Sequence, residues 1–351
     1  MANPHDRGGL PKFPHSYEAK TTIATVCVLG TYRDPKPITG QRVSLLEALL
    51  SGLPRGGAWA ALDAILLPAG YFRFAHPVGH LASADRMSAL RGLGFAKACD
   101  RISQALHTQW PELTLVVGAD SNALDRDYAG DQLVLAWRNG AIVGLARKAF
   151  PVWNETCDYE ANVWVHPDDA DDPHRFITLR NGARAVLCVC YDAFALRAVK
   201  GEAYADLAAI HYALQPYGEI GEFPWVERWR HLTRWVQNIQ LNAPELALVP
   251  IHYFWQPGRD GYWQRHGIAG ASAALDGAPV LGAAHFQRKL PRQEISTLAA
   301  RGVEQLHLTL GGKRLAQRLF PQHGFYLHGS DGEAIALVRL FQLDRRIGVF
   351  P

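Results

Sequence analysis

The sequence predicts an α/β protein whose central sheet is mixed. Between residues 21 and 117, apolar β-type runs alternate with helical periodicity, which is typical of strands joined by crossover helices. Farther on, Asn139-Gly140 and Asn181-Gly182 each lie between two apolar runs. Asn-Gly pairs favour tight hairpins because both positions tolerate positive φ, so antiparallel strands are expected beside the parallel ones.

The expected elements follow from these patterns and their stops. Residues 21–30 are a β-branched apolar run, and Pro68 and Pro111 stop a strand and a helix respectively. Residues 222–240 carry large apolar side chains at spacings of four and three, which indicates an amphipathic helix. In chain order we expect strands at 21–30, 62–67, 113–117, 133–137, 141–145, 176–179, 185–190, 246–251, 278–286, 324–327 and 333–340, and helices at 44–51, 87–110, 222–240, 262–275 and 293–302.

The domain organisation is expected to be simple. Residues 1–20 are rich in proline, glycine and charge and are interpreted as a loose N-terminal leader. Residues 21–351 contain no clear linker or internal repeat, so they are expected to form a single domain. Within it, 287–323 is a candidate insertion, and the polar 153–175 segment is a long loop of the kind that often carries function.

Composition excludes several classes of protein. The 351 residues are 48% hydrophobic and 20% charged, so the chain can bury a sizeable core. The net charge is +3 without a dense Lys/Arg block, which argues against nucleic acid as a partner. No apolar stretch approaches the roughly 18–20 residues of a membrane span. The first residues lack an apolar signal core, and the five cysteines show no framework spacing, so a cytoplasmic location is expected.

Two strand ends carry the chemistry. An apolar run ends at Cys190 and is followed at once by Tyr191 and Asp192, while Lys148 ends another apolar run just before Phe-Pro. A thiol held at the carboxyl end of a buried strand lies where α/β proteins usually bind ligands. A thiolate is a strong nucleophile, and a nearby cation favours it, so the pair predicts covalent chemistry on an acyl-type carbon.

These motifs resemble the nitrilase superfamily of carbon–nitrogen hydrolases. The resemblance rests on Lys148 after a strand, Cys-Tyr-Asp at 190–192 and Leu-Val-Pro at 248–250, and it covers about residues 21–345. It implies a four-layer α-β-β-α sandwich with mixed sheets, usually paired into a homodimer or higher homo-oligomer. It also implies a small-molecule amide, nitrile or acyl substrate, and neither a metal nor an organic cofactor.

The resemblance further implies a Glu–Lys–Cys triad, from which this chain departs. Cys190 would form a thioester, Lys148 would stabilise the oxyanion, and a carboxylate would move the protons. The position where the family has its glutamate holds Ala69, which cannot accept a proton. Glu155, seven residues after Lys148, is the leading replacement, and Asp192 is second, although that position more often ties down a turn. The remoter options are Asp120, Asp158 and Glu160.

The substrate pocket is expected to lie around the same strand ends. Candidate lining residues are Ala69, Tyr71, Tyr191, His252 and Tyr253. An aromatic core cluster at 252–255 is an equally good interpretation of the last two. Cys27, Cys99 and Cys188 are expected to be small core residues, Cys157 to be structural, and His76 and His80 not to bind metal. Besides the hydrolase, two alternatives stay open: a ligand-binding or regulatory protein without turnover, and an acyltransferase.

Overall fold

The structure is a computed structural model that describes residues 20–29, 39–121, 130–151, 166–200, 225–254, 267–286, 307–309, 316–318, 322–330, 332 and 334–344. Everything said below of the fold and the site concerns these residues. Glu155, Cys157, Asp158, Glu160 and the expected helix at 293–302 lie outside them.

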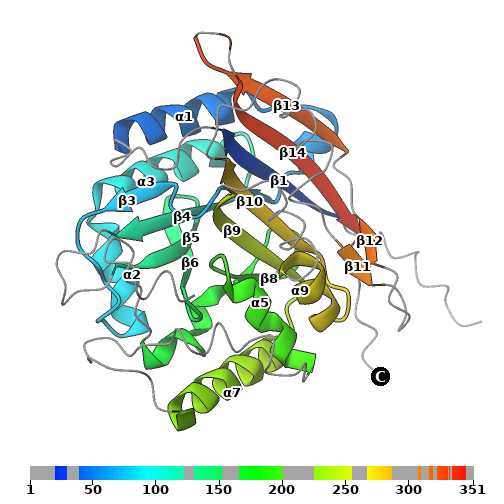
Figure 1. The fold of residues 1–351 in the computed structure, drawn as a ribbon. Coiled ribbons are helices and arrows are strands. Elements are labelled where there is room, and N and C mark those ends of the chain that lie inside the picture. The colour runs from blue at the N-terminus through cyan, green and yellow to red at the C-terminus, as the bar shows by residue number, and fades with distance from the viewer. Residues whose placement is uncertain are drawn as a thin grey trace, which may run out of the picture.

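A twelve-stranded mixed sheet organises the chain (Figure 1). Its main path runs β6-β5-β4-β2-β1-β10-β9-β8-β7, with β14 paired to β1 and β13, and β3 paired to β4. Pairing is parallel along β4-β2-β1-β10-β9-β8 and antiparallel at β4-β5-β6, β7-β8 and β1-β14-β13. The predicted mixed sheet is therefore confirmed.

The strand bounds are β1 Lys20–Leu29, β2 Ala64–Leu66, β3 Phe72–Phe74, β4 Thr114–Ser121, β5 Gln132–Arg138, β6 Ala141–Arg147, β7 Phe176–Thr178, β8 Arg184–Leu187, β9 Leu246–Phe254, β10 Val280–Phe286, β13 His323–His328 and β14 Ala334–Asp344. A separate two-stranded sheet pairs β11 His307–Thr309 with β12 Ala316–Arg318.

The hairpins form where the Asn-Gly pairs predict them. Asn139 and Gly140 both have positive φ, 48° and 74°, between β5 and β6. Between β7 and β8 only Gly182 has positive φ, 84°, and the Asn181 side chain accepts a hydrogen bond from the N–H of Ala183. The second turn therefore uses the asparagine as a local acceptor.

The helices are α1 Thr39–Ser51, α2 Ser83–Arg91, α3 Gly94–His107, α5 Asp192–Ala195, α7 Trp225–Asn242 and α9 Ala269–Ala274. The single helix expected at 87–110 is wrong, because α2 and α3 are separate. Leu93, between Gly92 and Gly94, is extended (φ −76°, ψ 149°), and glycines on both sides weaken the helical preference there. No helix in the described part of the chain combines the length and apolar character needed to span a membrane.

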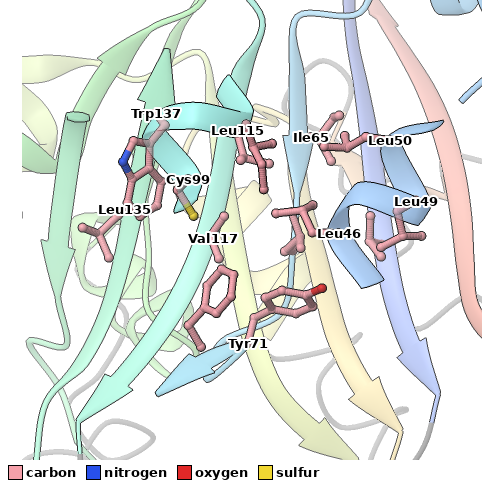
Figure 2. Close-up of a cluster of buried hydrophobic side chains, with 14 of the residues drawn as sticks. Leu46, Leu49, Leu50, Ile65, Tyr71, Cys99, Leu115, Val117, Leu135 and Trp137 are labelled. Atoms are coloured by element: carbon pink, nitrogen blue, oxygen red, sulfur yellow. The ribbon is translucent and has the colours of Figure 1, made fainter. Parts of the chain in front are cut away.

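Three clusters of buried side chains define four layers. The first cluster joins α1 and α3 to one sheet face, and Figure 2 shows part of it. The second joins α5, α7 and α9 to the outer faces of β8, β9 and β10. The third contains side chains from β1, β2, β4, β5 and β6 together with β7 to β10, so it lies between the two halves of the sheet. The order helix, sheet, sheet, helix is the predicted α-β-β-α sandwich, which is confirmed.

Candidate active site

Cys190 stands at the end of the strand path that begins with β8. Its main-chain N–H donates to the carbonyl of Pro250 at 2.9 Å, as that of Cys188 does to Leu248 at 3.0 Å, so this segment stays beside β9. The φ of Cys190 is 48°, in the left-handed region that non-glycine residues seldom adopt. Such strain is held by surrounding structure and clusters at functional sites. The side chain is 4% exposed, which places the sulfur at a buried strand end.

Lys148 follows β6 and is completely buried. Its main-chain N–H donates to the carbonyl of Gln132 at 3.0 Å, and its Nζ donates to Oε1 of the same glutamine at 2.8 Å. The Nζ also lies 5.6 Å from the ring centroid of Tyr191, the residue after Cys190. The structure thus brings the strand ends of Lys148 and Cys190 together, as the sequence predicts.

Asp192 ties these two strand ends to each other. Its carboxylate accepts hydrogen bonds from the N–H groups of Ala149 (3.1 Å) and Phe150 (2.9 Å), which follow Lys148, and from Val189 (3.3 Å) before Cys190. Burial raises the pKa of Asp192 to about 6, although nearby Arg175 and Lys148 and the backbone hydrogen bonds oppose the rise. Its oxygens are engaged by backbone, which fits the expected turn-fixing role.

His252 and Asp120 form a buried pair at the same edge. The Nε2 of His252, on β9, lies 3.0 Å and 3.3 Å from the two carboxylate oxygens of Asp120, on β4. The two residues are 7% and 5% exposed. Burial alone would lower the pKa of His252. The Asp120 carboxylate and a side-chain hydrogen bond with Cys190 outweigh burial and raise the pKa to about 10. His252 therefore links Asp120 to the Cys190 sulfur.

Strand register connects these groups into one row. Asp120 on β4 pairs directly with Gln132 on β5 in the antiparallel ladder. Directly opposed residues project to the same face of a sheet, so the carboxylate and the amide that holds Lys148 share one side. The polar groups of the site thus come from four strand ends, those that carry Lys148, Cys190, His252 and Asp120.

Position 69 lies beside this row. Ala69 is completely buried, and its N–H donates to the carbonyl of Ile251 at 3.3 Å, immediately before His252. His285, on β10, hydrogen-bonds to the backbone of Ala69, and burial lowers its pKa well below the usual value. A Cβ on Gly118 would lie 2.3 Å from the Cα of Ala69, so only glycine permits this approach.

The three tyrosines predicted to line the pocket have different surroundings. Tyr71 is buried in the cluster between α1 and the sheet, where its hydroxyl donates to the carbonyl of Arg42 at 2.8 Å (Figure 2). Its ring stacks on His285 of β10. Tyr253 lies on β9 and pairs with His285 of β10 in the parallel ladder, and the structure describes its backbone only. Tyr191 is half-buried at the site and stacks on Phe194.

A buried ionic network braces the strands beneath Lys148. The Arg147 guanidinium reaches Asp131 at 2.8 Å and Asp169 at 2.5 Å, and Arg86 reaches Asp169 at 2.7 Å. All four side chains are completely buried. Burial raises the pKa of Asp169, but Arg147 and Arg86 outweigh it and lower the pKa below the usual value. The network supports the strand end that carries Lys148.

In the described ranges, no group of three or more His, Cys, Asp or Glu side chains could hold a metal ion. The main finding that sequence reasoning missed is the link between His252 and Asp120. His252 was expected only to line the pocket, and Asp120 was only a remote candidate for the base. Both stand near the carboxyl ends of apolar strands, which is the signal that could have joined them.

Comparisons with known proteins give neighbours in structure only. The chain matches no family model, and no curated protein matches it. One similar solved structure is a mutant of the amidase from Nesterenkonia sp. AN1 with the acetamide moiety of fluoroacetamide added at its active-site cysteine (TM-score 0.43, 14% identity, 95% of this chain and 93% of that one). Another is a cysteine-to-alanine mutant of that amidase in complex with butyramide (0.43, 13%, 92% and 90%).

A third similar structure is a mutant described as Nesterenkonia AN1 amidase from the nitrilase superfamily (TM-score 0.40, 13% identity, 92% of this chain and 90% of that one). This is the family that the motifs around Lys148 and Cys190 resemble. All three TM-scores lie below 0.5.

Proposed function

We propose that the protein is an enzyme that hydrolyses a carbon–nitrogen bond of a small amide or nitrile through a thioester on Cys190. One observation carries the proposal: Cys190 is held in a left-handed conformation at a strand end, directly before the aromatic ring that lies by the buried Lys148 ammonium. Backbone strain clusters at active sites, and a nearby cation is one of the means by which a nucleophilic thiol is activated.

For an amide, the steps follow from the residues. The sulfur attacks the carbonyl carbon, and the Lys148 ammonium stabilises the negative charge that develops on the oxygen. The carbon–nitrogen bond breaks, a protonated leaving amine departs, and a thioester remains. Water then attacks the thioester, the carbon–sulfur bond breaks, and the acid product leaves with the thiol restored. A proton carrier is needed in both halves.

The cellular location, the oligomeric state and the domain organisation are part of the same proposal. The four cysteines that the structure describes, Cys27, Cys99, Cys188 and Cys190, are free, which fits a reducing compartment such as the cytoplasm. A homodimer is proposed, and α7 presents Trp229 at 47% exposure as a candidate contact. The single domain over 21–351 and the insertion at 287–323 likewise remain proposals, and so do the pocket roles of Ala69, Tyr71, Tyr191 and Tyr253.

The test is turnover over a panel of small amides and nitriles. We expect Cys190→Ala to lose ammonia or amine release, and wild type quenched in acid during turnover to carry an acyl mass increment on the Cys190 peptide. Cys188→Ala is the matched control, because Cys188 is a completely buried thiol on the same strand face. Unchanged product release by Cys190→Ala would overturn the proposal.

Ala69 is the observation that favours a second candidate function. The completely buried alanine at the position where the resemblance implies a glutamate is what motivates a ligand-binding or regulatory protein without turnover, or an acyltransferase. Wild type that binds panel compounds but releases no product would favour the binding protein. Product that carries the acyl group on an added amine would favour the acyltransferase.

A further inference from the structure

We infer that His252, oriented by Asp120, is the proton-transfer residue of the Cys190 site and takes the place of the carboxylate missing at position 69. The inference rests on the proposed function and deepens it, because it names the group that carries the proton in both halves of the reaction.

His252 contacts both Asp120 and Cys190. The Nε2 of His252 lies 3.0 Å from Oδ2 of Asp120, and the His252 side chain is also hydrogen-bonded to that of Cys190. With Nε2 directed at the carboxylate, Nδ1 is the other ring nitrogen able to exchange a proton. Nucleophile, base and orienting carboxylate in sequence are the constellation that activates nucleophiles on unrelated folds.

Backbone contacts fix this arrangement from both sides. The N–H of Cys190 donates to the carbonyl of Pro250 on β9, and His252 lies two residues after Pro250 on that strand. Cys190 is therefore held beside the part of β9 that carries His252. Asp120 is held across the sandwich on β4, where Gly118 permits the close approach of Ala69, and Ala69 is tied to Ile251. Position 69 therefore adjoins the residue before His252, and this proximity supports the imidazole as the replacement for a carboxylate at position 69.

The other described carboxylate at the strand ends is less suited to the task. Asp192 accepts hydrogen bonds from Ala149, Phe150 and Val189, and moving a proton through it would weaken the connection between the two strand ends. Asp120, by contrast, is directed at His252. The described geometry therefore favours an imidazole as base and a carboxylate as its positioning group.

The proton balance closes with His252 alone. In the resting pair His252 already holds the proton given up by the Cys190 thiol, and it passes this proton to the leaving nitrogen as the carbon–nitrogen bond breaks. In the second half the neutral imidazole takes a proton from water as the carbon–oxygen bond forms, and keeps it as the thioester breaks, which restores the thiolate and the imidazolium. The Asp120 carboxylate stabilises this imidazolium.

Electrostatics of the folded chain supports this role. The groups that face His252 are Asp120 from β4, Cys190 from the end of the β8 path, and His285 from β10. Asp120 and the sulfur favour the imidazolium, whereas His285 is held neutral by a pKa lowered through burial. A protonated His252 beside a thiolate is the resting pair that such a site uses.

The experiment has one arm that needs no substrate. Iodoacetamide alkylation of the Cys190 peptide is followed by mass spectrometry from pH 5 to 9 in wild type, His252→Gln and Asp120→Asn. Because the imidazolium stabilises the thiolate, we expect His252→Gln to react about tenfold or more slowly at pH 6, with a smaller difference at pH 9. Asp120→Asn should shift the profile in the same direction.

The second arm measures hydrolysis of the panel compound that wild type turns over fastest. We expect kcat to fall about 10²–10⁴-fold in His252→Gln, the usual contribution of a general acid–base group. His231→Gln is the matched control, because His231 is another buried histidine, 3% exposed, whose Nε2 lies 2.9 Å from the carbonyl oxygen of Ala149. Circular dichroism of each variant verifies that it is folded.

The outcomes separate the inference from the proposed function. If Cys190→Ala abolishes turnover while His252→Gln keeps wild-type kcat, the hydrolase stands and the inference fails. If His252→Gln loses turnover but its alkylation profile matches wild type, His252 is only structural and the inference also fails. If Cys190→Ala retains turnover, the proposed function fails, and the alkylation arm alone decides whether His252 governs the thiol.

Discussion

The Asp192 carboxylate accepts a hydrogen bond from the main-chain N–H of Ala149 at 3.1 Å, and this contact spans 43 residues of chain. It joins the strand end that carries Lys148 to the one that carries Cys190. The spatial relation between cation and nucleophile is therefore fixed by one buried side chain that itself takes no part in the proposed reaction.

Asp192→Asn should change how stability depends on pH. Burial raises the folded-state pKa of Asp192 from 3.8 to about 6. A raised pKa stabilises the fold fully below pH 4, and this stabilisation is lost as the pH rises through 6. Two pKa units correspond to about 3 kcal/mol, so the stability advantage of wild type over the variant should be about that much larger at pH 4 than at pH 7. Urea unfolding at both pH values measures it, and a pH-independent difference would contradict this account.

Lys148→Met should separate charge from shape at the site. Methionine keeps an unbranched apolar chain in a completely buried position but removes the ammonium. We expect kcat to fall about 10²–10³-fold, the usual cost of losing one group that stabilises an oxyanion. Steady-state kinetics on the best panel compound measures the fall, with near-ultraviolet circular dichroism reporting the fold. A variant with more than half of wild-type kcat would show that the ammonium is dispensable.

Gly118→Ala should disturb the edge where position 69 meets β4. The added methyl group would stand 2.3 Å from the Cα of Ala69 and 2.5 Å from the carbonyl oxygen of Pro68, both of them backbone atoms. We expect a loss of about 1–3 kcal/mol in unfolding free energy, the usual cost of overpacking, and a fall in kcat because Asp120 lies two residues on.

Gly94→Ala is the control for that measurement, because a Cβ there meets nothing within 4 Å. Thermal and urea unfolding of both variants should show a cost only at position 118. Equal stability of the two variants would mean that the strands have room which the structure does not show.

Ala69→Glu tests whether the site is rewired or decayed. The alanine is completely buried and adjoins the residue before His252, so a carboxylate there would be desolvated and would compete with Asp120 for the imidazole. We expect a lower melting temperature and no gain in kcat. Ala69→Gln has the same size without the charge, and comparing the two variants isolates the electrostatic part. A large gain in turnover with Glu alone would favour a site that has lost its base.

Local signals in the sequence located most of the fold. The Asn-Gly pairs predicted both inserted hairpins because these residues favour a tight turn locally, although the two turns differ in the φ of the asparagine. The strand preceding Cys190 and the one preceding Lys148 were located by apolar runs with polar stops. The break between α2 and α3 was missed because the apolar periodicity continues across Leu93 while its backbone becomes extended.

The candidate site could be predicted only in part. The positions of Cys190 and Lys148 at neighbouring strand ends were predicted because each follows an apolar run, and the contacts of Asp192 follow from its place after Cys190. The pairing of His252 with Asp120 was not predicted, because the two are separated by 132 residues. It depends on how β4 and β9 are placed relative to each other, and a position near the end of an apolar strand, which both residues share, does not by itself specify that pairing.

The hydrogen bond from Ala69 to Ile251 has a consequence for how the protein is made. It connects segments on opposite halves of the sandwich, far apart in sequence, so it can form only after both halves have assembled. Long-range closure of this kind is slow relative to hairpins and helices, because much chain entropy is lost before such contacts stabilise the fold. A newly synthesised chain would acquire its secondary structure well before the Cys190 site is assembled, so partly folded copies would lack the proposed activity.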